Sequence, residues 1–518
     1  MGTAVAVNPS VGPPFTKVQV TGVGFGSSET VSIDFDAKSV AKANTSSTGS
    51  LATTLRVPAS ALPGKHRVTA TGQTTGLSAS QAFLVRTNWP RFHFDLTNSG
   101  LNPFENVIGP TNVSKLVTAW TASLGVGKYI SDTSPVVANG IVYIGSSAQK
   151  LYAFNATGGS NCSGAPLKCE PLWTATYGSG QSGSNSSPVV ANGVVYVNSG
   201  GGNLYAFSAS GGTNCSGRPR VCAPLWTGTG GGGGTLASVA VAKGVVYTGG
   251  GSGNLLAFSA TGTTNCSGTP KTCAPLWAGQ TAAPSYLSSP AVLNGIVYVG
   301  ASDTGFQTGH IYAFSASGTT NCSGTPRTCG PLWTSGSVGA IVSSPAVASG
   351  VVYVGSMDKN LYAFSAAGTT NCTGTPRYCA PLWVDPTGGT IYASSPAVAY
   401  GSVYVGSADG KLYSFSAAGN ANCSGTPKVC TALWTGATGS PIDNSSPSAA
   451  NGVVYVGSVA GDIYAFGANG RTNCSGSPDM CTPLWTVATT SSINSSAAVA
   501  DGIVYIATEG NELFAFRG

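Results

Sequence analysis

Charged side chains are scarce in this sequence of 518 residues. Asp, Glu, Lys and Arg together make up 8% of it, whereas an average globular domain has about 25%. The formal net charge is only +6 at pH 7. Nucleic-acid-binding proteins need a dense basic patch or stripe, so the composition gives no support for a nucleic-acid partner.

Long apolar runs and helical patterns are also missing. No stretch of 18 or more consecutive apolar residues occurs, so we predict no membrane-spanning helix. No stretch of ten or more residues has an apolar period of 3.6, and we therefore expect almost no α-helix. The first residues, Met1 to Val5, lack the basic and apolar parts of a signal peptide. If the protein is exported, either a signal peptide has been removed or another route is used.

The signatures of common enzymes are absent as well. The three histidines, His66, His93 and His310, are too scattered for a catalytic triad or a zinc site to be inferred from their spacing. No H-E-x-x-H, G-x-S-x-G or EF-hand pattern occurs. The sequence therefore predicts no catalytic residue and no metal ligand by motif.

What the sequence does contain is a long repeat. Equivalent tryptophans recur every 50 to 56 residues, and self-similarity at such a period indicates a repeat architecture. The eight tryptophans are Trp120, Trp173, Trp226, Trp277, Trp333, Trp383, Trp434 and Trp485.

Each repeat contains four short segments typical of β-strands. In one repeat these are residues 343–347, 351–356, 361–366 and 381–383, separated by turn signals such as Ser349-Gly350. Four antiparallel strands form one blade of a β-propeller. The middle strands are apolar on both faces, as expected for a sheet packed between two others.

The number of strands predicts how the ring closes. The three-strand core occurs eight times, and the Trp-bearing strand also occurs eight times, but the first copy, Leu116 to Trp120, precedes any core. The chain ends after a third strand at Phe516-Arg517-Gly518. We therefore predict an all-β fold in which residues 113–518 form an eight-bladed β-propeller, closed by pairing of Leu116–Trp120 with Leu513–Phe516.

The 14 cysteines form seven couples with C-x6-C spacing, each between a third and a fourth strand. We predict seven local disulfides, since this spacing is unusual for zinc and no histidine accompanies it. Disulfides persist in oxidising surroundings, so we expect an extracytoplasmic protein: secreted, cell-surface or periplasmic. The couples are Cys162/Cys169, Cys215/Cys222, Cys266/Cys273, Cys322/Cys329, Cys372/Cys379, Cys423/Cys430 and Cys474/Cys481.

Residues 1–86 lack the repeat and contain several short alternating strands, which predict a small Ig-like β-sandwich. The phrases VTGVGFGSSETVSIDF and RVPASALPGKHRVTATG resemble immunoglobulin-like IPT/TIG modules of bacterial surface proteins. Residues 87–112 connect this domain to the repeats. We interpret them as an ordered linker that plugs one end of the ring, the alternative being a functional site.

The linker and the repeats resemble the PQQ-like (quinoprotein) propeller family. Trp89, Pro90 and Phe92 stand at that family's opening motif, and VVYVGS, NLYAFSA and LW resemble its repeat. The resemblance implies eight blades, as in quinoprotein dehydrogenases and in an outer-membrane assembly lipoprotein. In the family an Asp-Ala-x-Thr-Gly turn docks the tryptophan, whereas here Ser365 to Gly368 and a cysteine-bounded loop take its place. We expect the disulfide loop to substitute for part of that docking.

Enzymes of that family place their chemistry near the ring axis, on loops leading into the innermost strands. Those loops here end in serines, which either line a polar channel or cap their own strands. Asp132, Asp443 and Asn444 are the only candidates in these loops for a cofactor or Ca²⁺ site. They do not make a full set, and near-identical blades argue against a specialised pocket. We therefore expect no cofactor.

The interpretation that follows is an exported, non-catalytic scaffold or binding module. Its expected partner is a surface or envelope component, protein or carbohydrate. The alternative is a PQQ-dependent dehydrogenase of a small alcohol or sugar, with PQQ and Ca²⁺ bound.

Three further features stand out in the repeats. Six of the seven cysteine-bounded loops carry basic residues, for which we expect a role in solubility: Lys168, Arg218 with Arg220, Lys271, Arg327, Arg377 and Lys428. Each loop also contains Asn-Cys-Ser or Asn-Cys-Thr, but we expect no glycosylation there. Ser302 to His310 predicts an unusually long loop, and the Gly228–Gly234 run is interpreted as a flexible connector.

Overall fold

The computed structural model describes residues 2–125, 133–178, 186–230, 237–250, 253–281, 286–303 and 305–518. Within these residues the regular structure is β-strand, apart from the 3-10 helix η1 (Val113–Lys115). The chain divides into two compact units. Unit 1 comprises Met1–Asn88, Pro103–Ile108 and Ala500–Gly502, and unit 2 comprises Trp89–Asn102, Gly109–Val499 and Ile503–Gly518.

Unit 1 contains two sheets with alternating buried and exposed residues. In β3, for example, Val18 and Val20 are buried and their neighbours are exposed, the period expected of strands that cover a core on one side. The two sheets share one apolar core, to which Val20, Ile33 and Leu55 contribute. One sheet has the order β1 (Ala4–Asn8), β3 (Lys17–Val23), β6 (Leu51–Arg56), and the other β2 (Val11–Gly12), β8 (Ser78–Val85), β7 (Gly64–Gly72), β4 (Thr30–Phe35), β5 (Lys38–Asn44).

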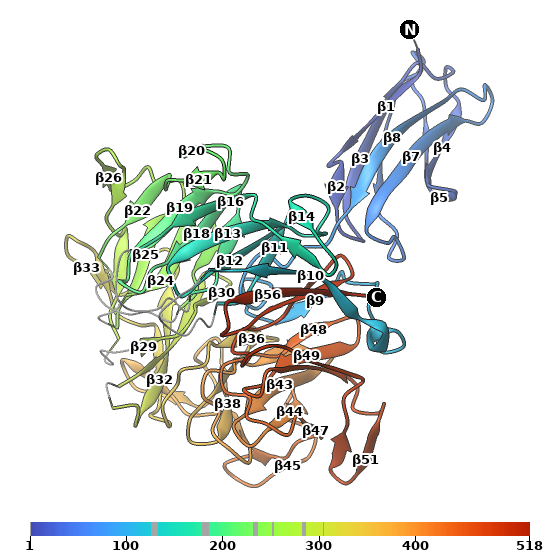
Figure 1. The fold of residues 1–518 in the computed structure, drawn as a ribbon. Helices are drawn as coiled ribbons and strands as arrows, with labels where there is room; N and C mark the ends of the chain where they lie inside the picture. The colour runs from blue at the N-terminus through green and yellow to red at the C-terminus, as the bar shows by residue number, and fades with distance from the viewer. Residues whose placement is uncertain are drawn as a thin grey trace. The chain divides into compact units, whose positions relative to one another are not determined.

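Unit 2 is built from repeated antiparallel sheets like those of a β-propeller, coloured from teal to red along the chain in Figure 1. The first strands are β11 (Val136–Ala138), β17 (Val189–Ala191), β23 (Ala240–Ala242), β30 (Ala291–Leu293), β36 (Ala346–Ala348), β42 (Ala397–Ala399), β48 (Ser448–Ala450) and β54 (Ala498–Ala500). The second strands are β12 (Ile141–Gly145), β18 (Val194–Asn198), β24 (Val245–Gly249), β31 (Ile296–Ser302), β37 (Val351–Gly355), β43 (Ser402–Ser407), β49 (Val453–Gly457) and β55 (Ile503–Ala507). The third strands are β13 (Lys150–Asn155), β19 (Leu204–Ser208), β25 (Leu255–Ser259), β32 (Gly309–Ser315), β38 (Asn360–Ser365), β44 (Lys411–Ser416), β50 (Asp462–Gly467) and β56 (Glu512–Arg517).

The fourth strand of each sheet starts at or contains the repeated tryptophan, and each of these tryptophans is buried. The second and third strands are apolar on both faces because sheets pack against both sides of them, as the sequence predicts. The fourth strands are β10 (Val117–Ser123), β16 (Trp173–Thr176), β22 (Trp226–Gly228), β28 (Trp277–Gly279), β35 (Trp333–Ser335), β41 (Trp383–Pro386), β47 (Trp434–Ala437) and β53 (Trp485–Ala488).

The predicted closing pair is confirmed. Strand β10 lies antiparallel to β56, with Thr118 opposite Phe516 and Trp120 opposite Ala515. Figure 1 shows the teal β10 beside the red β56, although the two strands lie at opposite ends of the repeat array. The first and last repeats therefore share one sheet.

The cysteine-bounded segments, predicted as loops, are two-stranded hairpins. All seven predicted disulfides are present, each joining the two strands of one hairpin. The hairpins are β14 (Cys162–Ser163) with β15 (Leu167–Cys169), β20 (Cys215–Ser216) with β21 (Val221–Cys222), β26 (Cys266–Ser267) with β27 (Thr272–Cys273), β33 (Cys322–Ser323) with β34 (Thr328–Cys329), β39 (Cys372–Thr373) with β40 (Arg377–Cys379), β45 (Cys423–Ser424) with β46 (Val429–Cys430), and β51 (Cys474–Gly476) with β52 (Asp479–Cys481).

Each hairpin extends the sheet before its own, so the prediction of four strands per sheet is corrected to six in most sheets. For example, β40 lies parallel to β35, with Trp333 opposite Arg377 and Ser335 opposite Cys379. The hairpin follows β38 in the chain but adds to the neighbouring sheet. The disulfide hairpins thus join consecutive sheets at their outer edge.

Side chains also join consecutive sheets. The Tyr298 hydroxyl and the Trp333 Nε1 both donate to the Ala366 carbonyl of the next repeat, at 3.0 and 3.1 Å. The indole of Trp333 packs on Gly368, whose φ is +61°, and a Cβ at that position would lie 2.2 Å from Cδ1. Glycine is therefore required both by the backbone conformation and by the close approach.

The predicted long loop at Ser302–His310 is corrected in extent. Strand β31 continues to Ser302 and β32 begins at Gly309, so the connection covers residues 303–308, of which Thr304 lies outside the described residues. The sheet gains a further strand, β29 (Tyr286–Leu287), on β31. In the Gly228–Gly234 run, residues 231–234 lie outside the described residues.

Among the described residues, no helix is long and apolar enough to cross a membrane.

Breaking one hairpin disulfide tests how far the hairpins hold the sheets. We expect the double variant Cys372→Ser, Cys379→Ser to lower the free energy of unfolding by about 2.5 kcal/mol, the loop-entropy value for an eight-residue loop. Urea unfolding of oxidised protein measures this change. Reduction of the wild-type protein should lower its Tm much further because all seven bonds are lost; an unchanged Tm on reduction would contradict a role in stability.

Candidate functional site

The predicted axial candidates are only partly described. Asp132 lies outside the described residues, as does Asn185 of the adjacent loop. Asp443 and Asn444 precede the first strand of one sheet and are half-buried. Burial raises the pKa of the Asp443 carboxyl, and the Asn444 Oδ1 is buried without a hydrogen-bond partner.

The serines that follow these loops have two different roles. In seven of the eight repeats the first residue of the pair is Ser or Thr and its hydroxyl bonds within its own sheet; Ser343 Oγ, for example, donates to the Gly355 carbonyl at 2.8 Å. The second residue joins the next sheet, because its N–H donates to the hydroxyl of the equivalent serine there, at 2.8–3.0 Å. The sequence order of this circle is Ser134, Ser187, Ser238, Ser289, Ser344, Ser395, Ser446 and Ser496, and Ser496 donates back to Ser134.

This circle of eight hydrogen bonds is buried. The exposure of the participating serines is 6% or less. Buried N–H groups need acceptors, and here each acceptor belongs to the neighbouring sheet. Neither of the two roles predicted for the serines includes these bonds between sheets. The eight serines that make them are termed here the serine circle.

The linker segment Trp89–Asn102 runs across the first strands in chain order. It hydrogen-bonds to each of the eight first-strand segments, mostly through its backbone. The partners are Val137 to Trp89, Val190 to Pro90, Val239 to Arg91, Val292 to Leu96, Val347 to Thr97, Val398 to Ser99, Ala449 to Gly100 and Val499 to Asn102. The last contact is made by Asn102, the second residue of β9 (Leu101–Asn102), and this strand lies parallel to β48.

The linker places ionisable groups inside this part of the unit. Arg91 and His93 are buried, with 6% and 1% exposure. Burial lowers the pKa of His93 to about 4 and that of Arg91 to about 10. His93 is therefore neutral and Arg91 charged at pH 7. His66 lies in unit 1 and His310 on β32, so the histidines form no common site.

A calcium–quinone site needs several oxygen ligands, usually six to eight for Ca²⁺. Within the described residues, no three His, Cys, Asp or Glu side chains lie close enough together to hold a metal. Glu509, which the sequence analysis missed, is hydrogen-bonded to Asn494. The repeated tryptophans are all buried within sheets, with 7% exposure or less, and Trp89 is 2% exposed. Within the described residues, no cluster of such ligands and no exposed repeat tryptophan is present.

Four of the seven basic residues of the hairpins are hydrogen-bonded within their own repeat. Arg377 Nη1 donates to the Gly368 carbonyl at 2.8 Å, on the glycine that supports Trp333. Arg220, Arg327 and Lys428 make the equivalent bond. These cations therefore stabilise the base of their hairpins, a role that the prediction of a solubility function missed.

The asparagines of the Asn-Cys-Ser/Thr sequences are also engaged. Asn371 has a φ of +57°, and its Nδ2 donates to the Pro381 carbonyl at 2.9 Å. Five other repeats have the same bond. These amides hold the hairpins in place.

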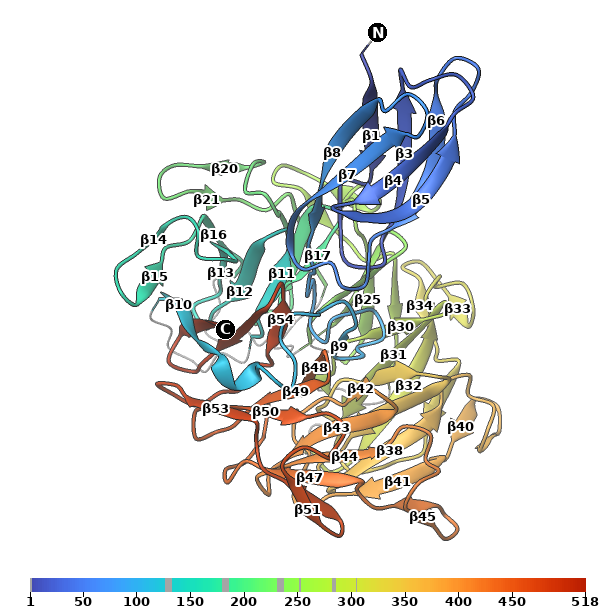
Figure 2. The same cartoon turned by 90° about the vertical axis from the view of Figure 1, so that its right-hand side faces the viewer.

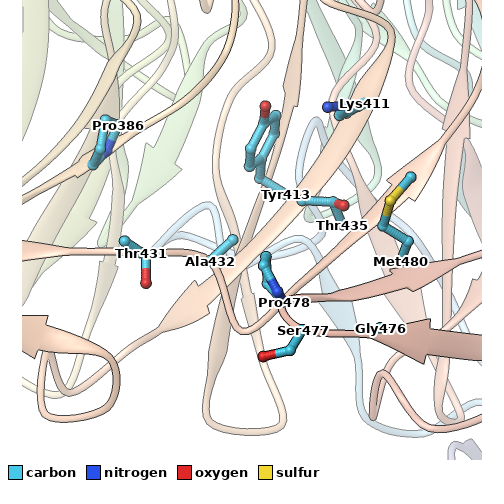
Figure 3. A pocket seen from close by; sticks show the side chains of 10 residues that line it. All are labelled: Pro386, Lys411, Tyr413, Thr431, Ala432, Thr435, Gly476, Ser477, Pro478 and Met480. Carbon is cyan, nitrogen blue, oxygen red and sulfur yellow. The ribbon is translucent and has the colours of Figure 1, made fainter.

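Shallow grooves lie between neighbouring hairpins. One, of about 410 Å³, lies between the third strand β44 and the hairpin β51–β52. Figure 3 shows Tyr413 at its centre, with Lys411, Pro478 and Met480 around it. Similar grooves of about 380 and 510 Å³ lie beside Arg377 and Arg327. These three grooves are lined by equivalent positions of different repeats, including the proline of the hairpin turn.

Asp385 is the most unusual ionisable group of the repeats. It is fully buried, and neither carboxylate oxygen has a hydrogen-bond partner. Burial raises its pKa to about 8, and the nearby Trp383 N–H partly offsets this rise although it does not reach hydrogen-bond geometry. The Trp383 indole is turned over: its Cδ2 and Cε2 face Gly419, whereas the equivalent glycines face Cδ1 and Nε1. The sequence analysis missed Asp385, although the other repeats have Gly, Ala, Ser or Val there.

The sequence of this chain is similar to a known family of repeat proteins. Residues 117–322 and 304–518 match a PQQ-repeat family whose model is described as outer membrane protein assembly factor BamB. The chain belongs to this family. A comparison with curated proteins finds no match.

Solved structures with the same fold include enzymes and a designed protein. Quinohemoprotein alcohol dehydrogenase from Comamonas testosteroni is 14% identical, with a TM-score of 0.56 and coverage of 83% of this chain and 80% of that one. A europium-containing methanol dehydrogenase is 13% identical, with a TM-score of 0.52 and coverage of 83% and 98%. The computationally designed Ika8 protein is 13% identical, with a TM-score of 0.54 and coverage of 77% and 99%. At these identities the likeness shows the fold alone.

Removing one hydroxyl tests the serine circle. Ser344→Ala leaves the buried N–H of Ser289 without its acceptor, and we expect the free energy of unfolding to fall by about 1–3 kcal/mol. Ser344→Thr keeps the hydroxyl and serves as the matched control. Urea unfolding of the three proteins measures the difference; equal stability of the Ala variant and the wild type would show that the hydrogen bond contributes nothing.

Asp385 predicts a specific pH dependence of stability. Its folded pKa of about 8 lies above the ordinary Asp value of 3.8, so its contribution to stability is fully present below about pH 4 and is lost as the pH rises to 8. Asp385→Ser imitates Ser335 of the preceding repeat. We expect the free energy of unfolding of this variant, relative to that of the wild type, to rise by more than about 1 kcal/mol when the pH is raised from 5 to 8. Urea unfolding at both pH values tests this, and parallel pH profiles would contradict it.

Proposed function

We propose that this protein is an exported, non-catalytic β-propeller scaffold or binding module. In this proposal the eight sheets of unit 2 are the blades of one closed ring, and residues 1–86 are an Ig-like module of the IPT/TIG type. The β10–β56 pairing and the serine circle support eightfold closure. The two sheets of unit 1 around one core support the Ig-like assignment.

The serine circle is the observation that carries the non-catalytic assignment. A catalytic site requires different residues from different blades, held in one constellation. Here equivalent positions around the first strands carry the same residue, serine, and those serines bond to one another. The linker Trp89–Asn102 additionally engages the backbone of the first strands. Both features commit this region to holding the ring together.

Location and partner follow from the surface and from the family. Seven disulfides support an oxidising, extracytoplasmic setting such as the periplasm or the cell surface. The family is described as an assembly factor, which favours a protein as the surface or envelope partner over a carbohydrate. The low charge gives no support for nucleic acid.

The alternative function, a PQQ-dependent dehydrogenase of a small alcohol or sugar, is supported by the fold of the quinoprotein structures alone. The full chain incubated with PQQ and Ca²⁺ distinguishes the two. We expect no saturable binding by calorimetry and no dye reduction over a panel of alcohols and sugars. Micromolar binding accompanied by turnover would overturn the proposed function, and an Asp443→Ala variant would then show whether that carboxylate takes part.

A further inference from the structure

The outer edge of β53 differs from the seven equivalent edges. Each of those fourth strands is covered by a parallel hairpin strand from the next repeat, in the pairs β10–β15, β16–β21, β22–β27, β28–β34, β35–β40, β41–β46 and β47–β52. Strand β53 is the last strand of its sheet, paired only with β50 among the described strands. Figure 2 shows it at the outer end of that sheet, beside η1. Among the described residues, no hairpin strand lies on this eighth edge.

The covered edges show which groups this edge presents. In them, the residue after the tryptophan donates its N–H to a hairpin carbonyl, as Ala278 does to Arg327. The third residue after the tryptophan donates to the carbonyl of the second cysteine, as Gln280 does to Cys329. By the same register, the N–H groups of Thr486 and Ala488 face the open edge of β53.

Exposure agrees with this assignment. Thr486 and Ala488 are exposed and Val487 is half-buried. At the position of Val487, the covered strands have buried residues, such as Ala122 with 4% and Ala175 with 1% exposure. The residues at the position of Thr486 in the covered strands are buried or half-buried. Thr486 and Val487 therefore lack the cover that their equivalents have, whereas Ala488 is exposed like most of its equivalents.

The start of β53 is protected in a different way. The Trp485 Nε1 donates to the Leu116 carbonyl at 3.1 Å, where Trp333 uses Ala366 of the following repeat. Helix η1 contacts β53 there. The tryptophan is thus satisfied, and only the backbone beyond it is open.

We propose that the outer edge of β53 is a docking site for a β-hairpin of a partner protein, which adds to the sheet in parallel register. This proposal rests on the proposed function, for which it names the surface and the kind of partner. The seven internal examples define the partner's chemistry: a short disulfide-closed hairpin of the type Asn-Cys-Ser/Thr-Gly-x-Pro-x-x-Cys. Its second cysteine packs against the sheet, since all seven such cysteines have 4% exposure or less.

A second copy of the chain fits the edge less well. Two β53 strands related by a twofold axis across the sheet edge would pair antiparallel, whereas every covered edge is paired in parallel. Recognition by strand addition obtains affinity from main-chain hydrogen bonds and specificity from the side-chain positions. The strand required is two or three residues long, as in β21 and β40.

The test uses the full oxidised chain and a labelled, disulfide-closed peptide with the sequence of residues 371–380. Fluorescence anisotropy should show saturable binding at one peptide per chain. Thr486→Pro removes the N–H that faces the edge, and proline is tolerated on edge strands, so binding should weaken at least tenfold. Thr486→Val keeps that N–H and should bind like the wild type. A linear peptide with both cysteines replaced by serine should bind at least tenfold more weakly.

A second variant covers the case in which Thr486→Pro does not fold. Residues 365–380 are copied onto the chain after Phe516, so that an internal hairpin occupies the edge. This variant should show a higher Tm under oxidising conditions and no peptide binding. Absence of saturation by 1 mM peptide, equal binding by the Pro variant, or a Thr486-dependent dimer without peptide would overturn the proposal. Turnover with PQQ would overturn the proposed function and leave the peptide result unchanged.

Discussion

Each sheet of unit 2 depends on the next sheet for the acceptors of its buried donors. The hydroxyl of the second-strand tyrosine and, in several repeats, the indole N–H of the fourth-strand tryptophan share one alanine carbonyl of the following repeat. A buried donor without an acceptor costs about 1–3 kcal/mol, so no repeat is complete alone. The array must therefore continue until it meets its own beginning. It does so at Ala156, which accepts from both Trp120 and Tyr505.

Neighbouring sheets also depend on each other at two further places, before the first strand and at the outer edge. Before the first strands the serine circle joins neighbours through N–H to hydroxyl bonds, and at the outer edge the hairpins do so through parallel strand pairing. Three sets of contacts between sheets restrict the same positions in each repeat, which explains why the repeats are nearly identical. Specialised function is then expected where a repeat departs from the pattern, as at Asp385 and β53.

The sequence predicted the features that recur with a regular period. The strands, the disulfide couples and the closing strand at Trp120 all follow from the spacing of tryptophans and cysteines. The hairpin strands were not predicted, because a two-residue strand such as Cys322–Ser323 has no alternation, and its sheet belongs to another repeat. Asp385 was visible as a substitution, but its burial depends on the sheet packed over that position.

At the outer edge of β53, the hydrogen bond to the tryptophan is present but the strand pairing is not. The Leu116 carbonyl replaces the missing alanine carbonyl for Trp485, so the linker satisfies the side chain. It does not supply a strand for the N–H groups of Thr486 and Ala488. Exposed sheet edges are usually protected, because they pair with other chains. Seven equivalent edges are covered by hairpin strands and that of β53 is accessible among the described residues, so β53 is the place where unit 2 is best suited to receive another polypeptide.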